Sequence, residues 1–235
     1  MEVHRHHGSH GSGWKANLKE FFMLFLAVLC GFFAEMKVHS VVEHEYEEEY
    51  ISSIVEDITS DIAQINILLS DYESQVRQMD TLMDVLASPE VLSDSRTAYR
   101  LWTDVQGFQD FSYDDRTIQQ LKSGAGLRLI RKSVVATAIM RYDQSIRKFQ
   151  LQRNIMNTEV VNQRFYFNLF DFAALRKSME SAVPLTASGK AFLNHAIGDR
   201  LFYKKSFLAM IDRLKEAYIQ AHKTLEDIKK NYDIE

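Results

Sequence analysis

Apolar residues recur every seven positions between residues 51 and 86, in two rows that lie four residues apart. The first row is Ile51, Ile58, Ile65, Tyr72, Met79 and Leu86, and the second is Val55, Ile62, Leu69, Val76 and Met83. This repeat predicts a helix of about 40 residues that buries one seam against other helices. Val41 and Val42 allow it to continue towards the N-terminus. Ser88-Pro89 is typical of its end, with Ser88 as the cap of a new helix.

The same repeat predicts two more long helices. In one, the rows are Val135, Tyr142, Phe149, Met156, Gln163 and Phe170, and Ile139, Ile146, Arg153, Val160, Phe167 and Ala174. In the other, the seam is Phe207, Ile211, Leu214, Tyr218, Ala221, Leu225 and Ile228. Shorter helices are expected near 97–106, 115–122 and 190–197. Asp114 is the expected N-cap of the 115–122 helix, and Gly124 is expected after it at positive φ.

An uncharged run of 14 residues, Phe21 to Ala34, precedes these helices. It is apolar on every side, as a membrane span is, and Leu18 to Met36 stretches it to 19 residues. Trp14 would lie at the headgroups, and Lys19 and Lys37 would extend towards water. Two other interpretations stay open, a cleaved signal peptide and a buried helix of a soluble protein. Small residues at a cleavage site are missing, which favours an uncleaved anchor.

Composition agrees with a helical chain. Only 2 prolines and 9 glycines occur in 235 residues, whereas β-sandwiches need many turns. No segment alternates apolar and polar positions between turn signals, so no sheet is expected. We therefore predict an all-α fold, with one N-terminal transmembrane helix followed by an elongated antiparallel helical bundle of three long helices and short connecting helices. Its expected divisions are a His-rich tail (1–13), a signal anchor (14–38) and a bundle domain (39–235).

Charge gives the expected orientation and partners. Lys and Arg precede the apolar run, whereas residues 38–76 hold ten acidic residues and no Lys or Arg. By the positive-inside rule the N-terminus is cytoplasmic and the bundle extracytoplasmic, or periplasmic in a bacterial inner membrane. The charged residues of 116–164 are mainly basic. We therefore expect the helix in this range to pack beside the acidic helix. A net charge of −4 gives no reason to expect nucleic acid as a partner.

Several segments resemble an uncharacterised bacterial family of single-span membrane proteins with a helical extracytoplasmic domain. They are GFFAE (31–35), EYISSIVEDITSDI (49–62) and TIQQLKSGAGLRLIRKSVVATAIMRYDQSI (117–146). The resemblance covers roughly residues 14–235. It implies the anchor and the helical domain, and it brings no known reaction with it.

Motifs of catalysis and metal binding are missing. There is no Walker, G-x-S-x-G or H-E-x-x-H pattern, and no Glu lies three residues before a histidine. We therefore expect neither an enzyme nor a cofactor. His39 with Glu43, and His44 with Glu48, fit a solvated helix face better than a cation site. The sequence leaves open whether His4, His6, His7 and His10 are native, and whether they bind metal.

Two groups of residues are candidate sites. Ala27, Gly31 and Ala34 form a small-residue face on the span that allows close approach of a partner helix. Arg153 and Gln163 interrupt the second apolar seam, where they either lie at its edge or form a polar site in the bundle. The expected function is a membrane-anchored binding or scaffolding protein that assembles with itself or another envelope protein. The alternative is a ligand-sensing bundle that signals through a membrane partner.

Overall fold

The computed structural model describes residues 13–105, 111–124, 126–162, 169–177 and 181–232. All regular elements in these ranges are helical, which confirms the all-α prediction for them. The elements are α1 (Trp14–Ala87), the 3₁₀ helix η1 (Pro89–Leu92), α2 (Arg96–Asp104), α3 (Arg116–Ser123), α4 (Gly126–Leu129), α5 (Ser133–Asn162), α6 (Phe172–Lys177), α7 (Ala187–Ala191) and α8 (Leu193–Tyr232).

The chain divides into two compact units, Met1–Glu49 and Tyr50–Glu235. We call them the N-terminal unit and the C-terminal unit, and α1 contributes residues to both. In the N-terminal unit the described residues belong almost entirely to α1. The most apolar window of 18 residues in this helix has a mean hydropathy of 2.0 and is 0% buried. The helix is therefore long and apolar enough to cross a membrane.

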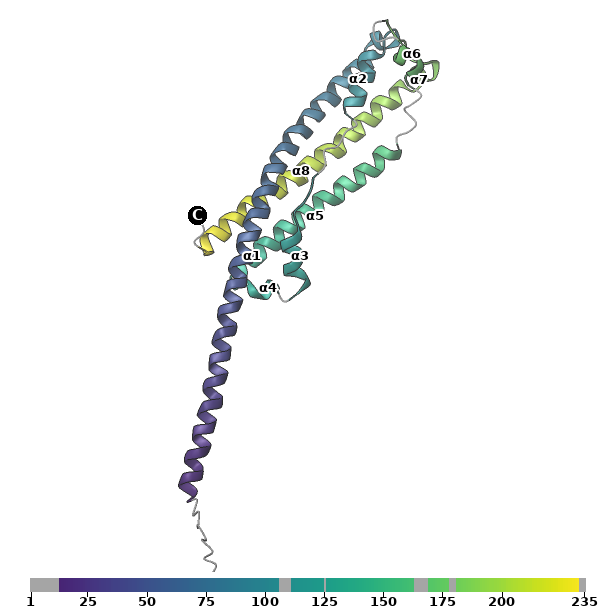
Figure 1. Ribbon diagram of the computed structural model, residues 1–235. Coiled ribbons are helices and arrows are strands. Elements are labelled where there is room, and N and C mark those ends of the chain that lie inside the picture. Colours follow the sequence, from purple (N-terminus) through teal and green to yellow (C-terminus); the bar gives the residue numbers. More distant parts are fainter. Residues whose placement is uncertain (1–12, 106–110, 125, 163–168, 178–180, 233–235) are drawn as a thin grey trace, which may run out of the picture. The chain divides into compact units, whose positions relative to one another are not determined.

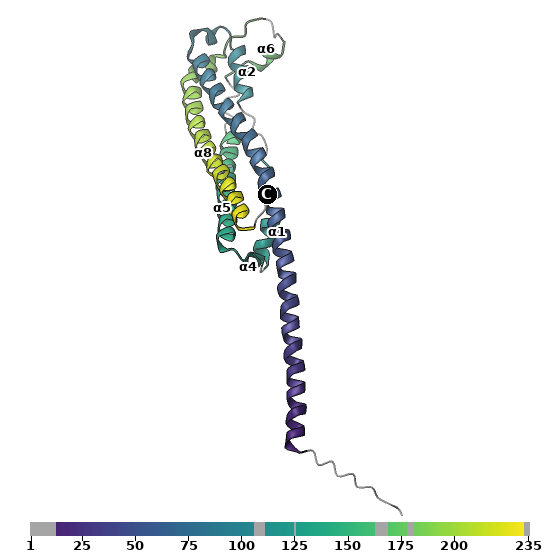
Figure 2. The same ribbon diagram turned by 90° about the vertical axis from the view of Figure 1, so that its left-hand side faces the viewer.

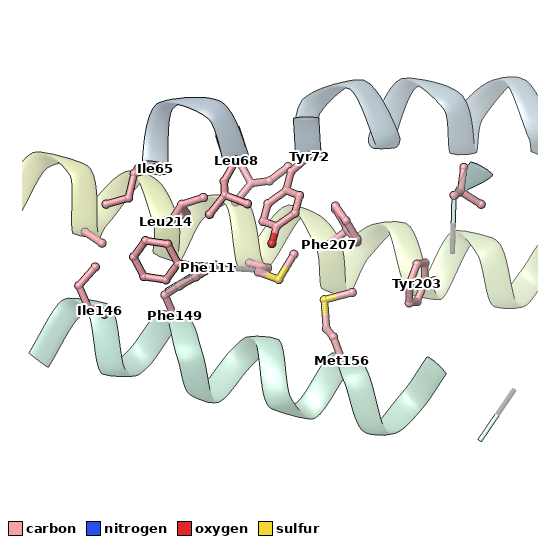
Figure 3. Close-up of a cluster of buried hydrophobic side chains, with 14 of the residues drawn as sticks. Ile65, Leu68, Tyr72, Phe111, Ile146, Phe149, Met156, Tyr203, Phe207 and Leu214 are labelled. Atoms are coloured by element: carbon pink, nitrogen blue, oxygen red, sulfur yellow. The ribbon is translucent and has the colours of Figure 1, made fainter. Parts of the chain in front are cut away.

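The C-terminal unit is organised around one hydrophobic core that α1, α5 and α8 share (Figures 1 and 2). Figure 3 shows Ile65 and Tyr72 of α1, Phe149 of α5 and Phe207 of α8 directed into it. The rings of Tyr72 and Phe207 meet edge to face, with centroids 5.2 Å apart. Burial of such large apolar side chains is the main source of stability in this unit.

The first predicted row of α1 is buried along its whole length, because Ile51, Ile58, Ile65, Tyr72, Met79 and Leu86 are at most 1% exposed. The second predicted row packs against the core at its edge, and the row one residue before it is more deeply buried. Val55, Ile62, Leu69, Val76 and Met83 are only partly buried, whereas Ile54, Asp61, Leu68 and Leu82 are buried. Positions three and four residues away lie on nearly the same helix face, so apolarity alone did not distinguish them. The more deeply buried row includes Asp61, so it places a carboxylate in the core.

Several predicted helix ends are corrected. The N-cap of α3 is Asp115 and not Asp114, whose carboxylate accepts a hydrogen bond from Arg116 Nε at 3.2 Å. Gly124 follows α3 with φ −121° and not with a positive φ. Of the predicted seam of 135–174, the members up to Val160 fall in α5 and Ala174 falls in the separate helix α6, whereas Phe170 lies between these helices and Gln163 and Phe167 lie outside the described residues. The expected short helix at 190–197 is divided between α7 and α8, and α8 runs on through the third seam.

Ion pairs show how α1 meets its neighbours in the C-terminal unit. Lys204 Nζ of α8 lies 2.5 Å from Asp80 Oδ1, and Lys215 Nζ lies 2.9 Å from Glu73 Oε1. These carboxylates of α1 are therefore paired with α8. With α5, α1 shares the hydrogen bond between Asp61 and Tyr142. The acidic helix thus contacts the basic one, as expected, through the core and this hydrogen bond, whereas Asp80 and Glu73 form their ion pairs with α8.

Candidate functional site

Asp61 of α1 is a fully buried carboxylate, with 0% of its surface exposed. Tyr142 Oη of α5 donates a hydrogen bond to Asp61 Oδ2, and the backbone N–H of Asp114 donates to Oδ1 at 3.4 Å. Burial raises the pKa of Asp61 to about 6, although both hydrogen bonds oppose the shift. The donors that hold this carboxylate carry no charge, so the site favours a proton on it.

Asp143, the residue after Tyr142, is a buried carboxylate in the opposite situation. Tyr113 Oη donates to Oδ1 at 3.1 Å, Arg147 Nε lies 3.1 Å from both oxygens, and Lys122 Nζ contacts Oδ2. Burial acts to raise the pKa of Asp143, but the hydrogen bonds and charges of Arg147 and Lys122 outweigh it and lower the pKa. Asp143 is therefore held as an anion.

Two tyrosines connect these carboxylates. The rings of Tyr113 and Tyr142 meet edge to face with centroids 6.1 Å apart, and each phenol donates to one aspartate. Burial and the neighbouring carboxylates raise the pKa of both phenols, so both stay protonated as donors. We call Asp61, Tyr113, Tyr142 and Asp143 the carboxylate–tyrosine cluster. It joins α1, the segment before α3, and α5.

The edge of this cluster carries a third acidic group. Asp57 lies one helical turn before Asp61 and is 9% exposed. Burial raises the pKa of Asp57, and a hydrogen bond with Thr117 opposes the shift. The cluster therefore has a side at Asp57 and Asp61 where protons are favoured and a side at Lys122 and Arg147 where negative charge is favoured. Such an arrangement can hold the register of three elements and make it depend on pH.

The carboxylate–tyrosine cluster was not predicted from the sequence. Tyr142 was expected on the buried seam, but Asp61 was not, since it lies one residue before the predicted second row. One signal was present in the sequence: Asp61 stands three residues after Ile58, in the same seven-residue register as Ile54, Leu68 and Leu82. A buried arginine was also missed, because Arg200 is 1% exposed and its guanidinium lies 4.2 Å from the ring centre of Trp102. Burial lowers the pKa of Arg200.

The predicted small-residue face and the predicted polar site both stay predictions. Ala27, Gly31 and Ala34 are exposed on α1, and a Cβ built on Gly31 meets no atom within 4 Å. Arg153 is half-buried on α5, whereas Gln163 lies outside the described residues. The polar site therefore stays a prediction, as does a partner for the small-residue face.

The histidines of α1 lie beside glutamates, as their spacing predicts. His39 Nδ1 is 3.4 Å from Glu43 Oε1, and His44 Nε2 is 3.3 Å from Glu48 Oε1. Among the described residues, no group of three or more His, Cys, Asp or Glu side chains is arranged to hold a metal ion. His4, His6, His7 and His10 lie outside the described residues, so metal binding by the tail stays open.

Comparison with protein-family models, curated proteins and solved structures finds no match to this chain. The resemblance to a family of single-span bacterial proteins therefore stays a prediction. The features that bear on function are the exposed apolar helix, the shared core and the polar groups within it.

Proposed function

We propose that the protein is a non-catalytic, single-span membrane protein whose C-terminal unit, an antiparallel helical bundle, binds or scaffolds a partner at the membrane. The observation that carries the proposal is the exposed apolar surface of α1. At least 49% of each of the following side chains is exposed: Phe21, Phe22, Met23, Leu24, Phe25, Leu26, Val28, Phe32, Phe33 and Met36. Leaving such side chains in water costs about 1.5–3 kcal/mol each, and a bilayer removes that cost.

The orientation in the proposal follows from charge. Lys15 and Lys19 precede the apolar segment, and the residues after Lys37 are acidic over a long stretch. The positive-inside rule then supports a cytoplasmic N-terminus and an extracytoplasmic C-terminal unit, in a bacterial inner membrane if the family resemblance holds.

Charges placed within the apolar segment test the anchor. We expect the double substitution Leu24→Lys and Val28→Lys to release the protein from membranes in alkaline carbonate, because each central charge costs about 3 kcal/mol in a bilayer. Ile67→Lys is the matched control, since Ile67 is 59% exposed on the same helix but in the C-terminal unit. This control should stay in the membrane pellet. Retention of the double variant in the pellet would contradict the proposed anchor.

The partner is proposed to be a second copy or another envelope protein, reached through Ala27, Gly31 and Ala34. Gly31→Leu should weaken crosslinking between copies in membranes, because it fills the face that lets helices approach. A Cβ at Gly31 meets no atom within 4 Å among the described residues, and its neighbours on α1 are exposed, so the effect reports on assembly. Met36→Leu, on the opposite face of the helix, is the control. Equal crosslinking in both variants would remove this face from the proposal.

The alternative function is a ligand-sensing bundle, and one feature favours it. Asp61, at the centre of the polar cluster, belongs to the same helix as the apolar segment. A change in the hydrogen bonds between α1 and α5 would therefore act directly on the helix that continues to the anchor. A full-length protein that is monomeric and free of co-purifying chains would favour this alternative.

A further inference from the structure

A hollow of about 390 Å³ lies between α5 and α8. Ala138 and Thr224, which are 7% and 1% exposed, form its floor. Thr224 Oγ1 lies 2.7 Å from the carbonyl oxygen of Gln220 and 3.2 Å from that of Ala138 in α5, so the floor is a close and polar contact between the two helices. The volume falls within the range of about 300–1,000 Å³ that is typical of small-molecule sites.

The rim of this hollow carries charges from both helices. Arg141 of α5 and Lys223 of α8 are exposed and line it, together with Gln220 and Asp227. Among the described residues neither cation forms an ion pair, although Asp227 follows Lys223 by one helical turn. Two cations that face a shared hollow without a carboxylate partner favour an anion between them.

Other hollows of the C-terminal unit differ in this respect. Arg147, beside a second hollow on α5, is held by Asp143 at 3.1 Å. Arg96, beside a hollow on α2, is held by Asp94 at 2.6 Å, and this pair lowers the pKa of Asp94 to about 2. These guanidinium groups already have their anions. The α2 hollow also carries Arg100, an exposed cation without an ion pair among the described residues, whereas the hollow between α5 and α8 carries two such cations, Arg141 and Lys223. The hollow between α5 and α8 therefore presents more available positive charge.

We propose that this hollow binds a small carboxylic acid that also carries an amino or hydroxyl group. Arg141 and Lys223 would bind the carboxylate from opposite sides, as charge-assisted hydrogen bonds do. Asp227 would accept a hydrogen bond from the amino or hydroxyl group, which sulfate cannot donate. Gln220 can both donate and accept at the rim. The site lies within the C-terminal unit and does not depend on the proposed anchor.

Calorimetric titration of the full chain in mild detergent tests the proposal, with L-glutamate, citrate and sulfate as probes. We expect saturable binding of glutamate or citrate below about 10 mM and weaker binding of sulfate. Arg141→Ala with Lys223→Ala should reduce affinity at least about tenfold, because both charges that hold the carboxylate are lost. Lys190→Ala with Lys205→Ala removes two exposed charges outside the hollow and is the matched control. Both pairs lie at the surface, and unfolding curves of each variant verify that it folds.

Each outcome decides the proposal. No saturable binding of any probe to the folded wild type overturns it, as does equal loss in the two double variants. Asp227→Asn should weaken glutamate or citrate but not sulfate. If sulfate binds as tightly as the organic acids and Asp227→Asn changes nothing, the hollow is a plain anion site, and the proposed ligand class is wrong. None of these results depends on whether the protein is in a membrane.

Discussion

Asp61 and Asp143 show that environment decides what a buried aspartate does. Both are almost fully buried in the C-terminal unit, and each accepts a hydrogen bond from a tyrosine. Asp143 also meets Lys122 and Arg147, which compensate for its lost hydration. Asp61 meets a phenol and a peptide N–H, which compensate for it only in part. Its ionised form is therefore a cost to the folded state at neutral pH.

Replacement of Asp61 by asparagine should change how stability depends on pH. The pKa of Asp61 is about 6 in the folded chain, against an ordinary value of 3.8. As pH rises between these two pKa values, the Asp61 carboxyl loses its proton in the unfolded chain but keeps it in the folded chain. The free energy of unfolding therefore falls as pH rises, by about 3 kcal/mol over the whole titration. Asp61→Asn removes this loss. Relative to wild type it should therefore gain about 2 kcal/mol between pH 4 and pH 7, measured by denaturant unfolding.

The control for this measurement is Asp212→Asn on the exposed surface of α8. Its unfolding free energy should stay parallel to that of wild type over the whole pH range. Opposing contributions, such as that of Asp143, are shared by all three proteins and cancel in the comparison. Parallel curves for Asp61→Asn and wild type would show that Asp61 is hydrated or paired with a cation in solution.

At the scale of elements, the existence of the long helices was predictable and their contacts were not. Seven-residue periodicity identified α1, α5 and α8, because an apolar seam that continues over many turns is typical of a helix packed against other helices. The choice between Val55 and Ile54 as core residues depends on where the neighbouring helices lie, which one helix does not encode. The same ambiguity concealed Asp61, so the polar cluster could not be found before the packing was known.

Gly126, at the junction of α3 and α4, is another residue whose contacts could not be predicted from the sequence. The expected special position was Gly124, but its φ is −121° and a Cβ there comes no closer than 3.9 Å to another residue. A Cβ on Gly126 would lie 2.9 Å from the Cα of Leu121, where backbone must move. The glycine is therefore required for the close approach of α4 to the end of α3.

Alanine substitutions at Gly124 and Gly126 should show that the close approach of α4 to α3 requires a glycine only at position 126. Gly126→Ala should lower the free energy of unfolding by about 1–3 kcal/mol, because the added carbon strains a packed junction. Gly124→Ala should change it by less than about 1 kcal/mol, since the space and the backbone accept a side chain. Denaturant unfolding of both variants measures the difference. Equal stability of the two would mean that the α3–α4 junction adjusts at little cost.

At the scale of the whole molecule, the two units have surfaces of opposite character. The C-terminal unit has a hydrophobic core and single exposed apolar side chains outside it, whereas the N-terminal unit leaves its large apolar side chains exposed around the helix. No apolar face of the N-terminal segment is distinguished from a polar one, so packing against a single partner would leave the other sides in water. A surrounding bilayer removes the apolar side chains on all sides of the helix from water.

Cysteine labelling tests this environment and the orientation together, because Cys30 is the only cysteine in the chain. A membrane-impermeant maleimide needs a hydrated thiolate, so Cys30 should react after denaturation but not in intact membranes. In a Cys30→Ser background, Ser60→Cys should react in intact spheroplasts, whereas Gly13→Cys should react only after they are permeabilised. Reaction of Gly13→Cys alone in intact cells would reverse the orientation. Reaction of Cys30 in intact membranes would place the apolar helix in water and leave the protein without its anchor.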